Sequence, residues 1–269
     1  MRLFVGLFLI ASGIAAFWTF KDERKSPQTE NTSSLASTAR PVLVELFTSE
    51  GCSSCPPADA LLSKLNRQPF SGVEVVALGE HVDYWNNLGW RDPYSSSDFS
   101  RRQNAYADVF GKTSIYTPQM IVDGQEEFVG SDDNKARAAI LRAAQAQKAL
   151  VELSVADDKT DQANVVLSVK VSDLPQKKEK AEVFLALTED KLTSDVSRGE
   201  NAGRVLTHSA VVRQLVSLGQ FEAGQPDFTR EETVPLSTAW KKGNLRIVVF
   251  VQASRTRRIL GVASLGPSL

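Results

Sequence analysis

Hydrophobic positions in the first half of the chain switch between strand-like and helix-like spacing. Val42–Phe47 and Val73–Leu78 are apolar runs of strand length, whereas Pro57–Leu65 carries its apolar residues at helical spacing. A second helix is indicated by the spacing of Phe99, Tyr106, Val109 and Phe110. These patterns predict two strands and two helices in alternation.

A hairpin and an alanine-rich helix complete this half of the chain. Gln119–Val122 and Glu126–Val129 flank Asp123-Gly124, which is a strong signal for a tight hairpin turn. Ser131 or Asp132 then caps a helix that runs to about residue 148. The order predicted for residues 41–148 is therefore β-α-β-α-β-β-α.

After residue 148 the hydrophobic spacing changes from helical to a period of two. Apolar and polar residues alternate in Val151–Val155, Val165–Val171, Val183–Leu187 and Leu245–Val251, with turn-like polar clusters between them. This pattern predicts an antiparallel β-sandwich of about seven strands. We therefore expect an α/β domain at residues 41–148 followed by an all-β sandwich domain at residues 149–269.

The N-terminal residues have the pattern of an export segment. Arg2 precedes the apolar run Leu3–Phe20, and charge returns at Lys21. The run suits either a cleaved signal peptide or an uncleaved membrane anchor, so residues 1–25 are assigned to one of these two. Residues 26–40 form a polar linker. The protein is predicted to be exported, either periplasmic or anchored in the membrane and facing the periplasm.

Composition excludes several classes of function. The 31 Lys and Arg residues almost balance 32 Asp and Glu residues, for a net charge of −1, so no electrostatic footprint for nucleic acid exists. The two cysteines exclude a scaffold stapled by many disulfides, and the two histidines leave few ligands for a metalloenzyme. No metal site is assigned.

The candidate chemistry lies between the first predicted strand and the first helix, in Cys52-Ser53-Ser54-Cys55. This spacing allows a disulfide, and backbone N–H groups at a helix start favour a thiolate on the first cysteine. Cys52 is then the nucleophile and Cys55 the resolving thiol. Pro56 and Pro57 shift the predicted helix start to Cys55, which weakens this support for Cys52. An inert structural disulfide is the alternative interpretation.

The element order, the dithiol after the first strand and the segment Tyr116-Thr117-Pro118 resemble the thioredoxin and glutaredoxin superfamily. The resemblance implies that Pro118 follows a cis peptide bond and that the Thr117 backbone pairs with an extended substrate. It also implies that Ser131 and Asp132 begin a helix that holds a carboxylate of glutathione, although a plain helix cap explains them more simply.

The sequence from about Pro41 to the end is also similar to a bacterial secreted, thioredoxin-like family described as a domain of unknown function, the domain of unknown function 1223 family. The motifs that carry the similarity are Val44–Asp59, His81–Trp85, Tyr116–Gln119 and Gly199–His208. This resemblance implies a thioredoxin-like domain ahead of the sandwich and a redox role.

Three further residues are candidates for assisting the dithiol: Glu45, His81 and Asp83. The superfamily's buried acid corresponds to Leu46 in this chain, and Glu45 beside it faces the opposite side of the sheet. His81 follows the second strand and could favour a thiolate, whereas Glu50 next to the dithiol would oppose one.

The loop after His81 is rich in aromatic residues and should share one rim with the dithiol. Tyr84, Trp85 and Trp90, together with Tyr116, are candidates for a substrate-binding wall; alternatively, the loop aromatics seal the contact with the sandwich. Arg204 and His208 could face the redox site, but a solvated pair of strands is the preferred interpretation.

These features predict an exported thiol–disulfide oxidoreductase that acts on protein disulfides or thiols with an unidentified redox partner. It needs no organic cofactor, and glutathione is a candidate co-substrate. The chemistry requires an exposed sulfur beside a cis Pro118. Two alternatives remain: a periplasmic copper-binding protein that uses the dithiol and His81, and a binding module with a structural disulfide.

Overall fold

The computed structural model describes residues 1, 3, 39–68, 72–155, 163–175 and 179–266. Contacts divide the chain into residues 1–36 and one compact unit of residues 37–269. The predicted export segment lies outside the described residues except for Met1 and Leu3, and so does the linker except for Ala39 and Arg40. In the described part of the chain, no helix has both the length and the apolar character needed to span a membrane.

The described residues form three α-helices and thirteen strands. The helices are α1 (Pro56–Arg67), α2 (Ser97–Phe110) and α3 (Asp133–Ala143). The strands are β1 (Arg40–Thr48), β2 (Val73–His81), β3 (Gln119–Val122), β4 (Glu126–Val129), β5 (Leu150–Val155), β6 (Asn164–Ser172), β7 (Ala181–Glu189), β8 (Leu192–Val196), β9 (Arg204–His208), β10 (Val211–Phe221), β11 (Phe228–Pro235), β12 (Leu245–Ala253) and β13 (Ile259–Leu265). The order β-α-β-α-β-β-α before residue 149 is confirmed, although α3 ends at Ala143, a few residues earlier than expected.

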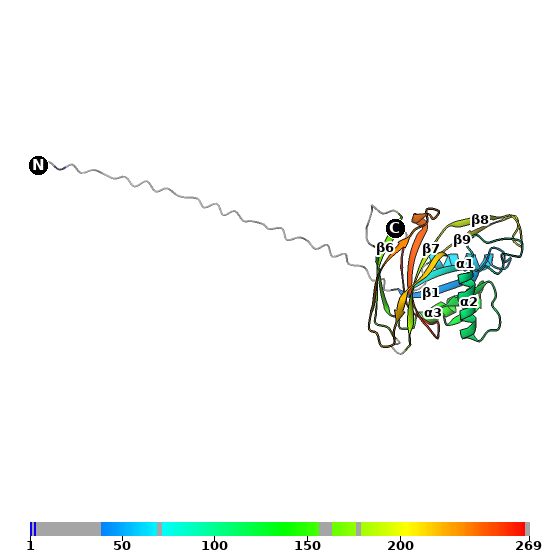
Figure 1. Cartoon of the computed structure of the whole chain (residues 1–269), viewed down its shortest axis with the longest axis horizontal. Helices are drawn as coiled ribbons and strands as arrows, with labels where there is room; N and C mark the ends of the chain where they lie inside the picture. Colours follow the sequence, from blue (N-terminus) through cyan, green and yellow to red (C-terminus); the bar gives the residue numbers. More distant parts are fainter. Residues whose placement is uncertain (2, 4–38, 69–71, 156–162, 176–178, 267–269) are drawn as a thin grey trace. The chain divides into compact units, whose positions relative to one another are not determined.

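The predicted fold class is wrong. Strands from both halves of the chain join in one mixed eight-stranded sheet with the order β13-β12-β7-β10-β2-β1-β3-β4 (Figure 1). Of the residues that the structure describes, 45% are in strands and 18% are helical. It is therefore mostly β, and a thioredoxin-like α/β domain followed by a separate all-β sandwich does not describe it.

The two halves of the large sheet meet where β10 pairs with β2 in parallel, with Val211 opposite Gly79. The Gly79 N–H donates to the Ala210 carbonyl oxygen at 2.7 Å. A Cβ atom on Gly79 would lie 3.3 Å from the carbonyl oxygen of Ser209, so the absence of a side chain permits this close approach. This pairing makes β2 an inner strand, and no local sequence signal identifies β10 as its partner.

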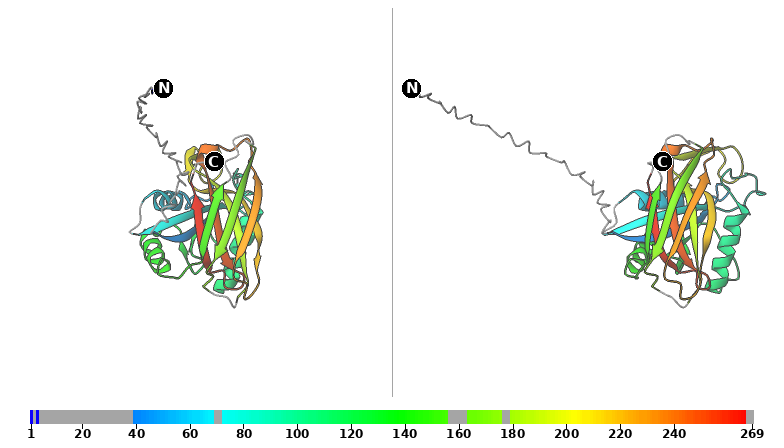
Figure 2. Two further views of the ribbon diagram at one scale, coloured as in Figure 1. Left: turned by 90° about the vertical axis from the view of Figure 1, so that its left-hand side faces the viewer. Right: turned by 60° about the vertical axis from the view of Figure 1, so that its left-hand side comes forward.

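One face of the large sheet is covered by two different layers. The three-stranded sheet β11-β6-β5 packs its inward residues, such as Leu167 and Val169, against Leu185 of β7 and Val249 of β12 (Figure 2). Helices α1 and α3 cover β1 and β3 on the same face through a second cluster that includes Leu62. Because successive side chains of a strand point to opposite faces of a sheet, every second residue of these strands contributes to this layer.

The opposite face of the large sheet packs against α2. Phe99 and Tyr106 of this helix join Phe47 of β1 and Phe250 of β12 in a third apolar cluster. The cluster spans both halves of the sheet, so α2 ties them together on this side.

A separate two-stranded hairpin, β8-β9, completes the fold. It belongs to the second half of the sequence, yet β9 lies against α1 in the first half. This hairpin brings distant residues to the N-terminal end of α1, where the two cysteines are.

Candidate functional site

Cys52 and Cys55 form a disulfide in the turn between β1 and α1, with their Cα atoms 5.4 Å apart. The turn is held by the Cys52 N–H, which donates to the Ser49 carbonyl oxygen at 3.2 Å. Helix α1 begins at Pro56 with Cys55 as its N-cap residue. The two prolines therefore place the helix start after the second cysteine, as their positions in the sequence predict.

Both sulfur-bearing residues are buried. Cys52 and Cys55 have 0% of their surface exposed, whereas Ser53 and Ser54 between them are exposed. The expectation of an exposed sulfur is wrong for this conformation. A thiol in solution reaches Cys52 only if the residues that cover it move.

The connection between β8 and β9 lies against the backbone of the cysteine-bearing turn, and we call it the cover. Within residues 197–205, all of which the structure describes, Asn201 is the one buried residue. Its side-chain amide donates to the carbonyl oxygens of Glu50 at 2.8 Å and Cys52 at 3.0 Å. Glu200 accepts a hydrogen bond from the Ser53 N–H at 3.0 Å. A few polar contacts thus hold the cover against the disulfide-bearing turn.

Glu50, two residues before Cys52, is buried and fully engaged in hydrogen bonds. Its carboxylate accepts from the indole N–H of Trp90 at 2.7 Å and lies 3.1 Å from Nε2 of His208. Its backbone N–H donates to the carboxylate of Asp92 at 2.8 Å. A buried carboxylate therefore lies directly beside the disulfide-bearing turn.

His208 connects Glu50 with a second buried carboxyl group, that of Asp59 on α1. Nδ1 of His208 lies 3.9 Å from Oδ2 of Asp59. Burial raises the pKa of the Asp59 carboxyl, and the nearby imidazoles of His208 and His81 oppose this shift without cancelling it. The preference for a solvated β8-β9 pair is therefore wrong at His208, which is 4% exposed.

His81 lies in the same buried group but is paired with another acid. Its Nδ1 is 2.7 Å from Oδ2 of Asp92, and its ring packs edge to face against that of His208 with centroids 4.8 Å apart. Burial lowers the pKa of His81, but Asp92, together with Asp59 and Glu50, outweighs burial and raises the pKa above its ordinary value. Burial raises the pKa of Asp92, and His81 with two backbone N–H groups brings it below its ordinary value.

The aromatic loop lies against both the dithiol turn and its cover. The Trp85 indole N–H donates to the Thr117 hydroxyl at 2.8 Å, and a Cβ atom on Gly51 would lie 3.0 Å from Cβ of Trp85. A Cβ atom on Gly199 of the cover would lie 3.1 Å from Cβ of Trp90. These contacts fit the interpretation of the loop aromatics as a seal.

The Thr117–Pro118 peptide bond is cis, as the superfamily resemblance implies. The Pro118 carbonyl oxygen accepts from the Gly130 N–H at 2.9 Å. Trp85 connects Thr117 with the dithiol turn, because its indole contacts Thr117 and its Cβ lies against Gly51. The structure thus brings the Thr117–Pro118 segment to the same side of the molecule as the cysteines.

Glu45 is not beside the dithiol. Its carboxylate forms an ion pair with Arg102 and accepts a hydrogen bond from Tyr106, both on α2. Helix α2 covers the sheet face opposite to α1, so the alternation of β1 places Glu45 away from the cysteines. Asp83 accepts a hydrogen bond from the Ser100 hydroxyl on the same helix.

The remaining candidates have structural partners. Tyr84 donates to the side chain of Gln103, and burial raises its pKa to about 12. Tyr116 donates to Glu127. Ser131 is exposed, and the Asp132 carboxylate accepts from the Lys135 N–H at the start of α3, which is the simpler helix-cap interpretation.

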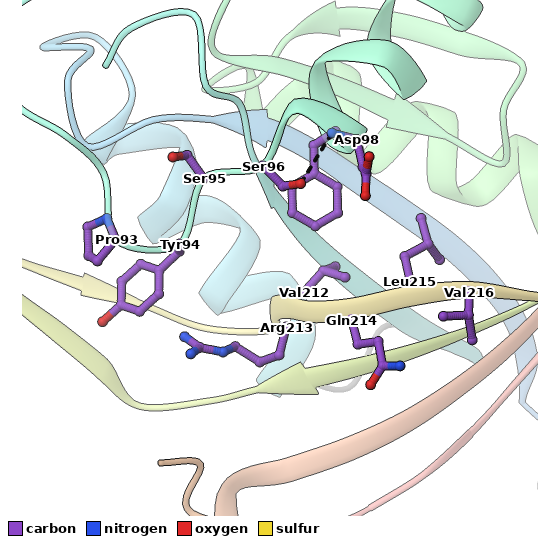
Figure 3. A pocket seen from close by; sticks show the side chains of 11 residues that line it. Pro93, Tyr94, Ser95, Ser96, Asp98, Val212, Arg213, Gln214, Leu215 and Val216 are labelled. Atoms are coloured by element: carbon purple, nitrogen blue, oxygen red, sulfur yellow. Dashed lines mark hydrogen bonds between the residues drawn. The ribbon is translucent and has the colours of Figure 1, made fainter. Parts of the chain in front are cut away.

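A pocket of about 420 Å³ lies beyond the two histidines, between the start of α2 and β10. Figure 3 shows Tyr94 and the guanidinium of Arg213 at one end of it and Asp98 and Leu215 at the other. The Tyr94 ring lies 5.5 Å from the ring of His81. Tyr94 therefore lies between the pocket and the buried histidines.

The copper-binding alternative expects Cys52, Cys55 and His81 as ligands. No group of three or more His, Cys, Asp or Glu side chains within the described ranges has the arrangement needed to hold a metal ion. Nδ1 of His81 is also engaged by Asp92.

Comparison with known families identifies this chain. A family model described as protein of unknown function (DUF1223) matches residues 43–252. The chain belongs to this family. No protein with a curated description matches this DUF1223 member.

Two solved structures are similar to this DUF1223 member. A protein from Agrobacterium tumefaciens has 28% identity and a TM-score of 0.64, over 84% of this chain and 94% of that one. HBP35 of Porphyromonas gingivalis has 15% identity and a TM-score of 0.62, over 86% of this chain and 76% of that one. The second similarity concerns the fold alone.

Asn201 and Asp59 are among the residues of this site that sequence reasoning missed. Asn201 gives no local signal, because its partners lie 151 and 149 residues earlier. Asp59 does give one: it lies among Ala58, Leu61 and Leu62 on the buried side of α1, where an acidic residue is unexpected. A carboxylate within an apolar helical stripe was the available clue.

Proposed function

We propose that this DUF1223 protein is an exported thiol–disulfide oxidoreductase whose reactive group is the Cys52–Cys55 pair. The observation that carries the proposal is the environment of this pair. Glu50, Asp59 and His208 are all buried beside the cysteine-bearing turn or the helix that follows it. Buried ionisable groups are costly, and their clusters are common where a reaction needs protons to move.

The reaction exchanges one disulfide for another. In the oxidising direction, a thiolate of a substrate protein attacks Sγ of Cys52, the Cys52–Cys55 bond breaks, and Cys55 leaves as a thiolate that takes up a proton. A second substrate thiolate then attacks the mixed disulfide and releases reduced Cys52. The substrate loses two electrons and the cysteine pair gains them. The reducing direction is the reverse, with Cys55 attacking the mixed disulfide.

Exchange also requires the β8-β9 cover to open. We propose that release of the hydrogen bonds from Asn201 and to Glu200 uncovers Cys52, because every residue of this connection other than Asn201 is exposed. Water can satisfy the freed backbone groups once the connection has moved.

The proposed location and partners follow from the sequence. The apolar run Leu3–Phe20 supports export to the periplasm, with or without a retained membrane anchor. Protein thiols or disulfides are the favoured substrates, and glutathione remains a candidate co-substrate. No organic cofactor enters the proposed reaction.

Trapping of mixed disulfides tests this function. A Cys55→Ser variant cannot resolve a mixed disulfide, so we expect Cys52 to accumulate bound to defined exported proteins, which are released by reductant and identified by mass spectrometry. Cys52→Ser, which lacks the attacking thiol, is the matched control. Capture that is absent from Cys55→Ser, or equal in both variants, would contradict the proposal.

The full burial of both cysteines favours a second candidate, a binding module with a structural disulfide. In that case Cys52→Ser would lower the free energy of unfolding without changing the reduction of insulin or the refolding of scrambled ribonuclease. The oxidoreductase proposal instead expects wild-type activity in one of these two assays and its loss in Cys52→Ser.

A further inference from the structure

Asp59 places a buried carboxyl group one helical turn beyond Cys55. The Asp59 N–H donates to the Cys55 carbonyl oxygen at 3.1 Å, in the first turn of α1. Side chains four residues apart lie on the same face of a helix, with Cβ atoms about 5–6 Å apart. Cys55 is 0% exposed and Asp59 is 8% exposed, so both are on the buried side of α1.

The start of α1 offers a thiolate little other support. Pro56 and Pro57 carry no N–H group, and the next two N–H groups, those of Ala58 and Asp59, both donate to the Cys55 carbonyl oxygen. The first turn of the helix therefore has few free N–H groups to stabilise a thiolate, which leaves side chains such as that of Asp59 to influence its protonation.

His208 faces Asp59 with an unused nitrogen. Its Nε2 lies 3.1 Å from the Glu50 carboxylate, whereas its buried Nδ1 has no hydrogen-bond partner in the described part of the chain. Nδ1 lies 3.9 Å from Oδ2 of Asp59. A buried polar atom without a partner destabilises the folded state. This arrangement suits a group that exchanges a proton with the carboxyl during a reaction.

The other ionisable groups facing Asp59 come from every neighbouring element. His81 is at the end of β2, and Asp92 lies in the loop that follows; both interact with Asp59 electrostatically, and so does His208 on β9. The Thr48 hydroxyl on β1 also faces the carboxyl. Burial is the largest influence and raises the pKa of Asp59, so its carboxyl holds a proton at higher pH than an exposed aspartate does.

We propose that Asp59, assisted by His208, is the proton-handling group of the Cys52–Cys55 pair. When the disulfide is opened, the Asp59 carboxyl gives its proton to the departing Cys55 thiolate. In the reverse step, the Asp59 carboxylate takes the proton of the Cys55 thiol while Cys55 attacks the mixed disulfide at Cys52, and the substrate leaves as a thiolate. This inference rests on the proposed exchange function.

An aromatic disulfide, dithiobis(nitrobenzoate), separates the attack by Cys52 from the resolution by Cys55. Reduced protein releases one coloured thiolate when Cys52 attacks the reagent and a second when Cys55 resolves the mixed disulfide. We expect Asp59→Asn to slow the second release about 100-fold at neutral pH and to shift its pH midpoint upward, without slowing the first. Asp59→Glu should restore part of the second rate.

Two further variants complete the test. His208→Gln should slow the second release less than Asp59→Asn does, and it decides the question if Asp59→Asn fails to fold. Glu80→Gln is the matched control, because it neutralises a buried carboxyl on the large sheet away from the Asp59–His208 pair; we expect its two releases to match the wild type. A wild-type rate and pH profile for the second release in the folded Asp59 and His208 variants would overturn the inference.

The outcomes separate this inference from the proposed function. Wild-type protein that releases neither thiolate refutes exchange chemistry, and the inference with it. If the second release depends on Asp59 but no exported protein is captured, the proton transfer by Asp59 is supported and the proposed action on protein substrates is refuted. Two releases that do not depend on Asp59 refute only the inference.

Discussion

Replacing Asn201 with alanine tests whether the β8-β9 connection controls access to the disulfide. Asn201 is 0% exposed and donates hydrogen bonds to the carbonyl oxygens of Glu50 and Cys52. A buried hydrogen bond contributes about 1 kcal/mol net, so the loss of both should weaken the closed state by about 2 kcal/mol. That free energy corresponds to an increase of about 30-fold in the open population.

The assay is the rate at which dithiothreitol reduces the disulfide, followed by trapping the free thiols with a maleimide and counting the added mass. If reduction proceeds through opening of the cover, Asn201→Ala should be reduced about 30-fold faster than the wild type. Asn104→Ala is the matched control, because Asn104 makes an exposed hydrogen bond within α2. We expect the control to react at the wild-type rate.

Urea distinguishes opening of the cover from unfolding of the whole protein. Local opening exposes little surface, so the reduction rate should depend only weakly on urea, whereas global unfolding exposes much more and gives a steep dependence. An unchanged reduction rate in Asn201→Ala, or an equally steep urea dependence in wild type and variant, would refute the assignment of Asn201 as the residue that holds the cover closed.

Three other substitutions test the electrostatics and the fold. Burial raises the pKa of Glu80 well above its usual range, so ionisation of this carboxyl destabilises the folded protein more as pH rises. Glu80→Gln should therefore raise the free energy of unfolding, measured in urea titrations, more at about pH 8 than at about pH 4. Equal gains at the two pH values would contradict this. Asp92→Asn should lower the pKa of His81, as followed by NMR, because Asp92 opposes the effect of burial more strongly than Asp59 and Glu50 do; an unmoved titration would contradict the pairing. Gly124→Ala should destabilise the protein by about 3 kcal/mol in thermal or urea unfolding, because its Cβ would lie 2.0 Å from a carbonyl oxygen in the β12–β13 turn. Gly203→Ala is its control, since φ is also positive there but nothing lies within 4 Å; similar losses in both would show that the collision is not the cause.

Local patterns in the sequence predict most of the elements before residue 149. The hairpin around Asp123-Gly124 and the start of α1 after the two prolines follow from backbone chemistry that acts within a few residues. The same is true of the cap of α3 by Asp132. These features depend on neighbours in the sequence and are therefore visible in it.

The sheet could not be predicted in the same way. The pairing of Val211 with Gly79 joins segments that are far apart in the chain, and either strand pattern is equally compatible with a separate domain. Gly79 contains the one relevant hint, since a glycine within a buried strand often marks a close approach by another backbone. Because the sequence does not show which strand packs against Gly79, it suggests two independent domains.

The candidate site was predictable only in part. The cysteine pair and the cis bond before Pro118 follow from motifs, and Trp85 lies with them as the aromatic loop suggested. The group around His208 did not follow, because β9 alternates exposed and buried positions and resembles a solvated hairpin strand. The side chain of His208 points toward Glu50 and Asp59, which lie close to it only in the folded chain.

Because the cover and the histidine both come from the β8-β9 hairpin, the order of synthesis matters for the cysteines. Asn201 follows Cys52 by 149 residues, so a chain that emerges from its N-terminus presents both thiols long before the hairpin exists. For the proposed exported protein, we therefore expect the disulfide to form while the thiols are still accessible, before the hairpin packs against the cysteine-bearing turn.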